Sequence, residues 1–301
     1  MSTREPFFLH IVRSDGQTLD VGDGTEWVLS MNDMSDWVPL DYGVETSANV
    51  LTDGSTLVSK RVNEKDRTIR CVYWGRDRKG VRDRVISFFN PKYSFEAHLT
   101  YFGRTRWCGG EQIGFEMGIT DERTPPSFTW TLLCLDPYMR GEDGNDYSLT
   151  SSDPMFGFPF VSHMRKPLPD GTKKPVGFLA SRMIYDGLNT VYNSGDVPTS
   201  YRVQVTASGN LINPTFTKDG KFVKYVGTLH DGDVYVIDFE GAPPTVTLNG
   251  RNVISGCTRD STFVDMSLKT GPNIVTFTID NSANLLYADV RILYNKRYLG
   301  V

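Results

Sequence analysis

The side chains that could perform chemistry are scattered along this sequence. The four histidines, His10, His98, His163 and His230, stand far apart, and none forms the His-x-x-x-His pair that binds zinc on a helix. Neither a Gly-x-Ser-x-Gly nucleophile elbow nor a phosphate-binding loop of the Gly-x4-Gly-Lys-Ser/Thr type occurs. We therefore expect no catalytic residues, no metal site and no cofactor, and a protein that is not an enzyme.

The cysteines give the same indication. Cys71, Cys108, Cys134 and Cys257 stand singly, without the spacing of a metal or redox motif. We expect buried free thiols in a reducing compartment.

Charge is distributed unevenly along the first third of the chain. Residues 1–59 contain ten acidic and two basic residues, whereas residues 60–84 contain ten basic and four acidic residues. Either complementary surfaces meet between subunits, or basic side chains line a passage for a polyanion. The alternative is that the two stretches pair within one domain or are solvated. The candidate residues for such an interface between subunits or for such a passage are Arg76, Arg78, Lys79, Arg82 and Arg84.

The elements that must position these side chains are predicted to be strands. The 301 residues include 28 glycines, many of them in Asp-Gly or Asn-Gly pairs that favour tight turns. Between the turns lie short runs of β-branched and aromatic residues, several of which alternate apolar with polar residues, as in antiparallel sandwiches or barrels. The predicted strands are Arg67–Trp74, Ser94–Phe102, Ser127–Leu135, Tyr201–Thr206, Val234–Phe239, Asn273–Ile279 and Ala288–Tyr294.

One segment has helical spacing instead. In Lys79–Asn90, Val81, Val85, Ile86 and Phe89 fall on one face, and Pro91 ends the pattern. We expect a helix that packs across a sheet, with a short strand as the alternative. The basic candidates lie near its start, where the helix dipole disfavours them, and this mismatch favours an external partner.

The fold class is therefore all-β with one helix, in two domains. We place the boundary after the Asp136-Pro137 pair, which gives domains of residues 1–138 and 139–301. The N-terminal apolar stretch is too short for a secretory signal, and no run of about 18 apolar residues predicts a membrane span. We expect no membrane association and synthesis in a cytoplasm.

Small and polar turn residues follow one another in a distinctive order over about 80 residues of the C-terminal half. They are Asn193-Ser-Gly195-Asp196-Val-Pro198-Thr199, Gly209, Asn213-Pro214, Leu229-His-Asp-Gly232-Asp233, Asp238, Asn249-Gly250, Ser261-Thr-Phe263, Leu268 and Gly271-Pro-Asn273. The N-terminal half contains Asp53-Gly54-Ser55, the strand around Arg67–Arg70, the helix ending at Phe89-Asn90-Pro91, Leu132–Pro137 and Phe158-Pro159-Phe160. Through these residues the C-terminal half resembles the distal tail proteins of long-tailed, non-contractile bacteriophages, the siphophage tail-component family, and the N-terminal half is similar in outline.

The resemblance implies structural work at the virion tail tip. It implies an N-terminal tail-tube-like β-sandwich with a helix, which closes into a hexameric ring, and a C-terminal galectin-like or jelly-roll β-sandwich that projects from the ring. It implies that this homo-hexamer joins the tail tube to the tail-tip hub or baseplate, beside the major tail-tube, tape-measure and tail hub proteins. DNA passes through the ring at ejection only as a passenger, and the virion is assembled in the host cytoplasm.

Two other functions remain open at this point. The aromatic residues Trp107, Tyr185 and Tyr192 are typical of surfaces that stack on sugars, so a module that binds a host cell-wall glycan is the first alternative. A cell-wall hydrolase is the second, because a glycosidase needs only two carboxylates and these can stand anywhere in a β fold.

Overall fold

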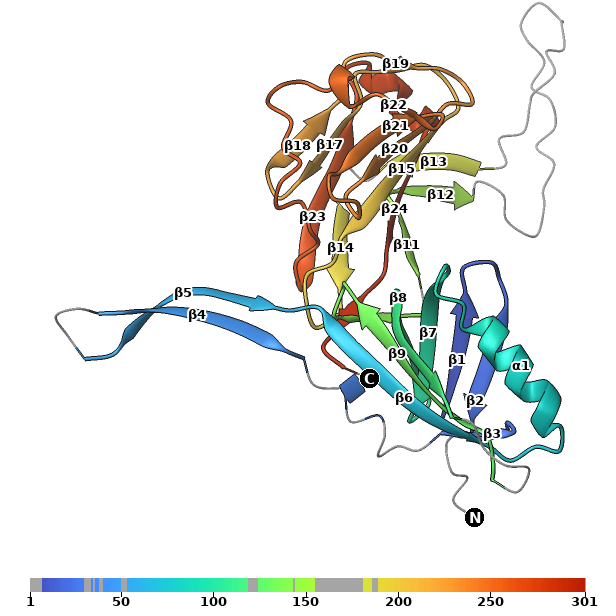
Figure 1. The fold of residues 1–301 in the computed structure, drawn as a ribbon. Coiled ribbons are helices and arrows are strands. Elements are labelled where there is room, and N and C mark those ends of the chain that lie inside the picture. Colours follow the sequence, from blue (N-terminus) through green and yellow to red (C-terminus); the bar gives the residue numbers. More distant parts are fainter. Residues whose placement is uncertain are drawn as a thin grey trace, which may run out of the picture. The chain divides into compact units, whose positions relative to one another are not determined.

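The computed structural model (Figure 1) describes residues 7–29, 34, 36, 37, 40–49, 53–118, 124–142, 144–154, 181–185 and 189–300. The chain forms two compact units. The first comprises Met1–Asp143 with Gly195–Val197 and Asn295–Val301, and the second comprises Gly144–Ser194 and Pro198–Tyr294. The division of the sequence into domains after residue 138 stays a prediction; the compact units divide after Asp143, and the C-terminal segment lies with the first unit.

The first unit is built on one antiparallel sheet. Its strands follow the order β2-β1-β7-β8-β9-β6-β3, with β10 paired to both β8 and β25. The strands are β1 (Phe8–Arg13), β2 (Thr18–Gly22), β3 (Trp27–Leu29), β6 (Lys65–Tyr73), β7 (Ser94–Tyr101), β8 (Arg104–Met117), β9 (Ser127–Cys134), β10 (Met139–Gly141) and β25 (Arg297–Tyr298).

Alternation of side chains creates the inner face of this sheet. Every second residue of β6 and of β9 is buried, and Ile69 of β6 pairs with Trp130 of β9 in the ladder. Since side chains point to opposite faces in turn, one face of each strand enters the core. Arg67, which carries a charge, occupies one of these inner positions and is completely buried.

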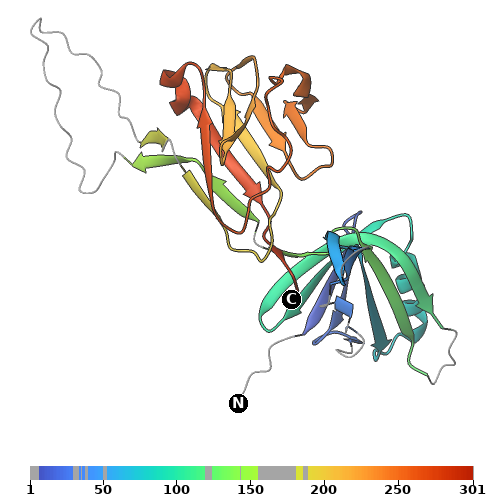
Figure 2. The same cartoon turned by 90° about the vertical axis from the view of Figure 1, so that its left-hand side faces the viewer.

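The predicted helix is confirmed as α1 (Arg78–Phe88). Asp77 caps it by accepting a hydrogen bond from the Gly80 amide at 2.9 Å. Val81, Val85 and Phe88, spaced four and three residues apart, enter the core of the sheet, and in Figure 2 the helix lies behind the strands. The expectation for Ile86 is wrong: its side chain is 44% exposed, because the buried stripe runs through position 88 instead.

A long hairpin was not predicted. Strands β4 (Tyr42–Ala48) and β5 (Ser55–Val62) pair only with each other and extend away from the sheet of the first unit (Figure 1). Nearly all of their residues are exposed, on both faces. The hairpin therefore contributes no residue to the hydrophobic core that is described.

The second unit is a β-sandwich of a six-stranded sheet (β11-β24-β15-β20-β21-β22) and a four-stranded sheet (β14-β23-β17-β18). Val203 and Ile292 from the first sheet share one core with Phe216 and Phe277 from the second. The elements of this unit are β11 (Asn145–Ser148), β12 (Thr150–Pro154), β13 (Ser181–Tyr185), β14 (Asn189–Asn193), β15 (Tyr201–Ala207), β16 (Leu211–Ile212), β17 (Thr215–Lys218), β18 (Lys221–Lys224), β19 (Thr228–Leu229), β20 (Val234–Asp238), β21 (Thr245–Leu248), β22 (Arg251–Asn252), β23 (Gly271–Thr278) and β24 (Ala288–Tyr294), with short 3₁₀ turns at Ile254–Gly256 and Ser282–Tyr287.

The predicted turns determine where these strands end. Asp219 and Gly220, at φ 46° and 83°, join β17 to β18, and Asn249 and Gly250, at φ 50° and 77°, join β21 to β22. Two successive positive φ values are what a tight hairpin requires, and Asp, Asn and Gly tolerate them. The all-β fold with one α-helix among the described residues is thus confirmed.

Candidate assembly surfaces

The five basic candidates lie together at the start of α1. Asp77 and Asp83 are the only acidic residues between positions 76 and 84, so this surface carries a net charge of +3 (five basic minus two acidic). The residues are Arg76, Arg78, Lys79, Arg82 and Arg84. This set is called the basic helix surface below.

Arg82 and Arg84 of the basic helix surface contact neighbouring groups of the same unit. The Arg82 guanidinium donates to the Gly118 carbonyl at 2.7 Å, and Nη2 of Arg84 lies 3.3 Å from Oδ2 of Asp77. The side chains of Arg84 and Asp77 are 68% and 62% exposed, so this ion pair is hydrated and weak. The sequence of this surface has more basic than acidic residues, and its ring or channel role stays a prediction.

The β4–β5 hairpin is the second candidate surface. Tyr42, Val44, Leu57 and Val58 are each between 56% and 59% exposed. A two-stranded hairpin is only marginally stable alone in water, and exposed apolar residues grouped on one element mark an interaction surface. The Asp53-Gly54 turn and the β-branched residues beside it are signals of a hairpin in the sequence. The strands were nevertheless missed, because neither has the alternation of apolar and polar residues that burial of one face imposes.

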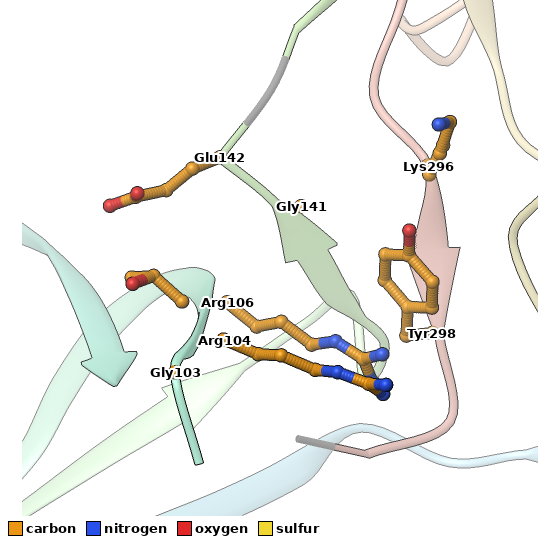
Figure 3. A pocket seen from close by; sticks show the side chains of 8 residues that line it. Gly103, Arg104, Arg106, Gly141, Glu142, Lys296 and Tyr298 are labelled. Carbon is orange, nitrogen blue, oxygen red and sulfur yellow. The ribbon is translucent and has the colours of Figure 1, made fainter. Parts of the chain in front are cut away.

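A polar pocket forms the third candidate. It has a volume of about 470 Å³ and lies where the start of β8, the end of β10 and the C-terminal segment meet within the first unit (Figure 3). Its ladder partners are Gly141 with Arg106, and Met139 with Tyr298. The lining residues are Gly103, Arg104, Thr105, Arg106, Gly141, Glu142, Lys296 and Tyr298.

Contacts within the pocket fix one of its arginines. The Arg106 guanidinium carbon lies 3.7 Å from the centre of the Tyr298 ring, and Nη1 donates to the Gly300 carbonyl. Burial, with the nearby charge of Arg104 in the same direction, lowers the pKa of Arg106, while Tyr298 and Asp196 act against that shift. Sequence reasoning missed this site because its residues come from positions near 104, 141 and 297.

The aromatic residues suggested for sugar stacking differ in their surroundings. Trp107 stacks on His98, with 5.8 Å between ring centres, and donates from Nε1 to the Gly141 carbonyl at 3.2 Å. Tyr192 on β14 is 61% exposed, whereas the side chain of Tyr185 lies outside those that the structure describes. Trp107 is therefore held by its own unit, and Tyr192 presents a ring to solvent.

Among the described residues, the other candidate side chains are not grouped into a catalytic or metal-binding centre. His98 lies between Glu96 and Glu142, His10 pairs with Asp20, and His163 is outside the described residues, as is the stretch at residues 158–160. Within the described ranges, no three His, Cys, Asp or Glu residues are grouped so as to hold a metal ion.

Cys71, Cys108 and Cys134 are buried and Cys257 is partly buried, all as free cysteines. No helix among the described residues is long and apolar enough to cross a membrane.

Comparison with known proteins gives a family match for the C-terminal part and structural matches for nearly the whole chain. Residues 194–298 match the family model of the siphovirus-type tail component, C-terminal domain. The crystal structure of phage SPP1 Dit, described as a paradigm of the hub adsorption apparatus in phages that infect Gram-positive bacteria, matches with a TM-score of 0.62 and 13% identity, over 96% of this chain and 98% of that chain. No curated relative matches the sequence.

The phage P2 baseplate gives a second structural match. A chain of that baseplate, in its activated conformation with calcium, matches with a TM-score of 0.54 and 7% identity, over 98% of this chain and 99% of that chain. The strontium form gives a TM-score of 0.53. At these identities the structures show a shared fold, and the family model matches the C-terminal part. The resemblance found in the sequence is thus confirmed: residues 194–298 match the siphovirus-type tail component, C-terminal domain, and the whole chain has the fold of the SPP1 Dit structure.

Proposed function

We propose that this chain is a distal tail protein: six copies form a ring that joins the tail tube to the tail-tip hub, and DNA passes through the ring during ejection. Its proposed partners are further copies of itself, the major tail-tube protein, the tape-measure protein and the tail hub protein. Assembly takes place in the host cytoplasm, and the finished ring belongs to the virion tail tip. The observation that carries the proposal is the exposed β4–β5 hairpin on a chain with a tail-component domain.

The hairpin supports a ring because it needs a partner. Its two strands expose apolar side chains on both faces, which costs stability in water. A neighbouring copy laid against it would remove those side chains from water at every interface of a closed ring, since each copy offers the same hairpin to the next.

The charge distribution supports the same arrangement. Residues 1–59 carry a net charge of −8 and residues 60–84 one of +6, and the basic helix surface carries +3. In a head-to-tail ring, acidic surface of one copy meets basic surface of the next, and such complementarity selects the correct partner.

Leu57→Lys combined with Val58→Lys is expected to convert the hexamer to monomer. Adjacent strand residues point to opposite faces, so the pair places a charge on each face of the hairpin. Native mass spectrometry and negative-stain microscopy measure the loss. The matched control is Val264→Lys with Leu286→Lys, which charges exposed apolar residues of the second unit and should leave six-fold rings. Rings that persist in the hairpin variant would remove the hairpin from the interface.

Arg82→Glu combined with Arg84→Glu is expected to weaken ring assembly by about tenfold or more at low salt, because each reversal replaces attraction with repulsion. The effect should shrink as ionic strength rises, since salt screens exposed charges. Sedimentation velocity over a concentration series measures it. Arg251→Glu with Arg259→Glu makes the same charge change on exposed residues of the second unit and serves as control. Unchanged assembly would place the basic helix surface away from the interface.

A further inference from the structure

The polar pocket of the first unit has a rigid frame. Its walls are three segments joined by backbone ladders: β8 pairs with β10 through Arg106 and Gly141, and β10 pairs with β25 through Met139 and Tyr298. The Gly141 amide also donates to the Lys296 carbonyl at 3.1 Å. Side chains on such paired segments are held in place before any ligand arrives, which lowers the entropic cost of binding.

The pocket has an excess of positive charge. Figure 3 shows the guanidinium groups of Arg104 and Arg106 side by side, beside the ring of Tyr298, with Lys296 on the same C-terminal segment as that ring. Among the described residues, the Arg104 guanidinium and the Lys296 ammonium have no hydrogen-bond or ion-pair partner. Two adjacent guanidinium groups repel each other unless an anion lies between or in front of them.

The acid in the lining does not neutralise this charge. Glu142 extends away from the two arginines in Figure 3, and its Oε1 lies 3.4 Å from Nδ1 of His98. Asp196 lies outside the lining and accepts a hydrogen bond from the Leu299 amide at 3.1 Å. The lining therefore contains three cationic side chains and one carboxylate that is turned elsewhere; the two guanidinium groups lie together, and the Lys296 ammonium lies beyond the Tyr298 ring (Figure 3).

The geometry points to an occupant: we propose that this pocket binds the phosphate group of a small organic phosphate. Guanidinium forks match the oxygens of a phosphate, and a lysine ammonium adds a point charge. Arg106 is oriented by Tyr298 and Gly300, and Arg104 beside it is left to bind the phosphate oxygens. Lys296, whose ammonium lies beyond the Tyr298 ring from the two guanidinium groups in Figure 3, is left for the group attached to the phosphate. A volume of about 470 Å³ exceeds that of a bare phosphate ion and leaves room for an attached polyol or sugar.

Isothermal titration calorimetry of the full chain with glycerol 3-phosphate tests the proposal. Saturable one-to-one binding is expected, with inorganic phosphate binding more weakly and acetate not binding in the same range. Arg104→Gln and Lys296→Gln should each weaken binding about tenfold or more, the range of a charged hydrogen bond. Glu142→Gln should strengthen it about two- to threefold by removing a like charge.

The matched control is Arg251→Gln, which removes an exposed arginine of β22 in the second unit and should leave binding unchanged. Arg104 is exposed and outside the core, so its variant is expected to keep the wild-type melting temperature. Equal affinity for acetate, equal loss in the control, no saturation by glycerol 3-phosphate, or wild-type binding by both Arg104→Gln and Lys296→Gln would each overturn the proposal.

Discussion

Gly110→Ala is expected to lower the free energy of unfolding of the first unit by about 3–5 kcal/mol. This loss lies at or above the usual range for overpacking, because the added methyl group would meet backbone atoms and not a movable side chain. A Cβ atom at position 110 would overlap the Leu133 carbonyl oxygen and lie 2.9 Å from the Leu133 carbonyl carbon. That carbonyl belongs to β9, which pairs with both β8 and β6, so it cannot move aside without disturbing the centre of the sheet.

The neighbouring glycine provides the control. A Cβ at Gly109 would meet no atom closer than 3.8 Å, so Gly109→Ala should be neutral or stabilising by about 0.5 kcal/mol through the lower entropy of the unfolded chain. All five tryptophans lie within residues 27–130, so tryptophan fluorescence during urea unfolding reports on the first unit alone. Equal unfolding midpoints for the two variants would show that the sheet accommodates a side chain at 110.

The strands that sequence alone predicted are those with a buried face. Tyr201–Thr206 and Ala288–Tyr294 were expected from their alternation, and they form β15 and β24, the paired central strands of the larger sheet. Burial on one face imposes a period of two on the residues. That signal was sufficient for both strands, neither of which is bounded by an Asp-Gly or Asn-Gly pair.

The features that sequence missed depend on partners distant in the chain. The β4–β5 hairpin has no buried face, so its residues carry no period that would distinguish it from a loop. The phosphate pocket exists only because the C-terminal segment returns to pair with β10, bringing Lys296 near Arg106. Neither spacing nor charge pattern could predict that pairing.

Some turn residues of the family resemblance have a structural reason in the second unit. Asn193 is buried and donates from its side chain to the Leu268 carbonyl at 3.1 Å. The side chain of Asn273, also buried, accepts from the Lys269 amide and donates to the Lys269 and Gly271 carbonyls, each at between 2.8 and 3.0 Å. These side-chain amides provide hydrogen-bond partners for backbone groups of loops that enter the core. Asn is suited to both positions because its side chain donates and accepts hydrogen bonds, and this requirement can be recognised in the sequence.

Arg67 lies in a strand that was predicted from the sequence, but the sequence did not show how its buried charge is balanced. It is completely buried on the inner face of β6, where Nη2 donates to the Pro137 carbonyl at 2.8 Å. Its Nε and Nη1 have no hydrogen-bond partner among the described residues. Cys134 on β9 pairs with Lys65, one inner position away from Arg67. A buried guanidinium without a carboxylate requires another source of negative charge.

Cys134 provides that charge as pH rises. A hydrogen bond from the Cys108 thiol, aided by the positive charge of Arg67, lowers the pKa of Cys134 to about 7 although burial acts against the shift. The same hydrogen bond and burial raise the pKa of Cys108. A thiol with a depressed pKa in the folded state stabilises the fold above its unfolded pKa of about 8.5, and that stabilisation is lost as pH falls through 7.

The stability of the first unit is therefore expected to increase between pH 7 and about 8.5 relative to a Cys134→Ser variant, whose own curve should lack this increment. The increment should shrink in Cys108→Ala and in Arg67→Met, because each removes one cause of the lowered pKa. Urea unfolding followed by tryptophan fluorescence at several pH values measures it, and thiolate absorbance near 240 nm follows Cys134 directly. An identical pH dependence in wild type and Cys134→Ser would assign the effect to another group.

Arg67→Ala is expected to destabilise the first unit by about 3–5 kcal/mol at pH 8, because it removes a buried charge partner and leaves the Pro137 carbonyl without its donor. Arg67→Met keeps an unbranched stem in the same space and removes the two unpaired nitrogens together with the charge, so it should recover most of that loss. At pH 6, where Cys134 is protonated, Arg67→Met should approach or exceed wild-type stability. Comparable losses for Arg67→Ala and Arg67→Met at both pH values would mean that the guanidinium is satisfied by contacts other than the thiolate.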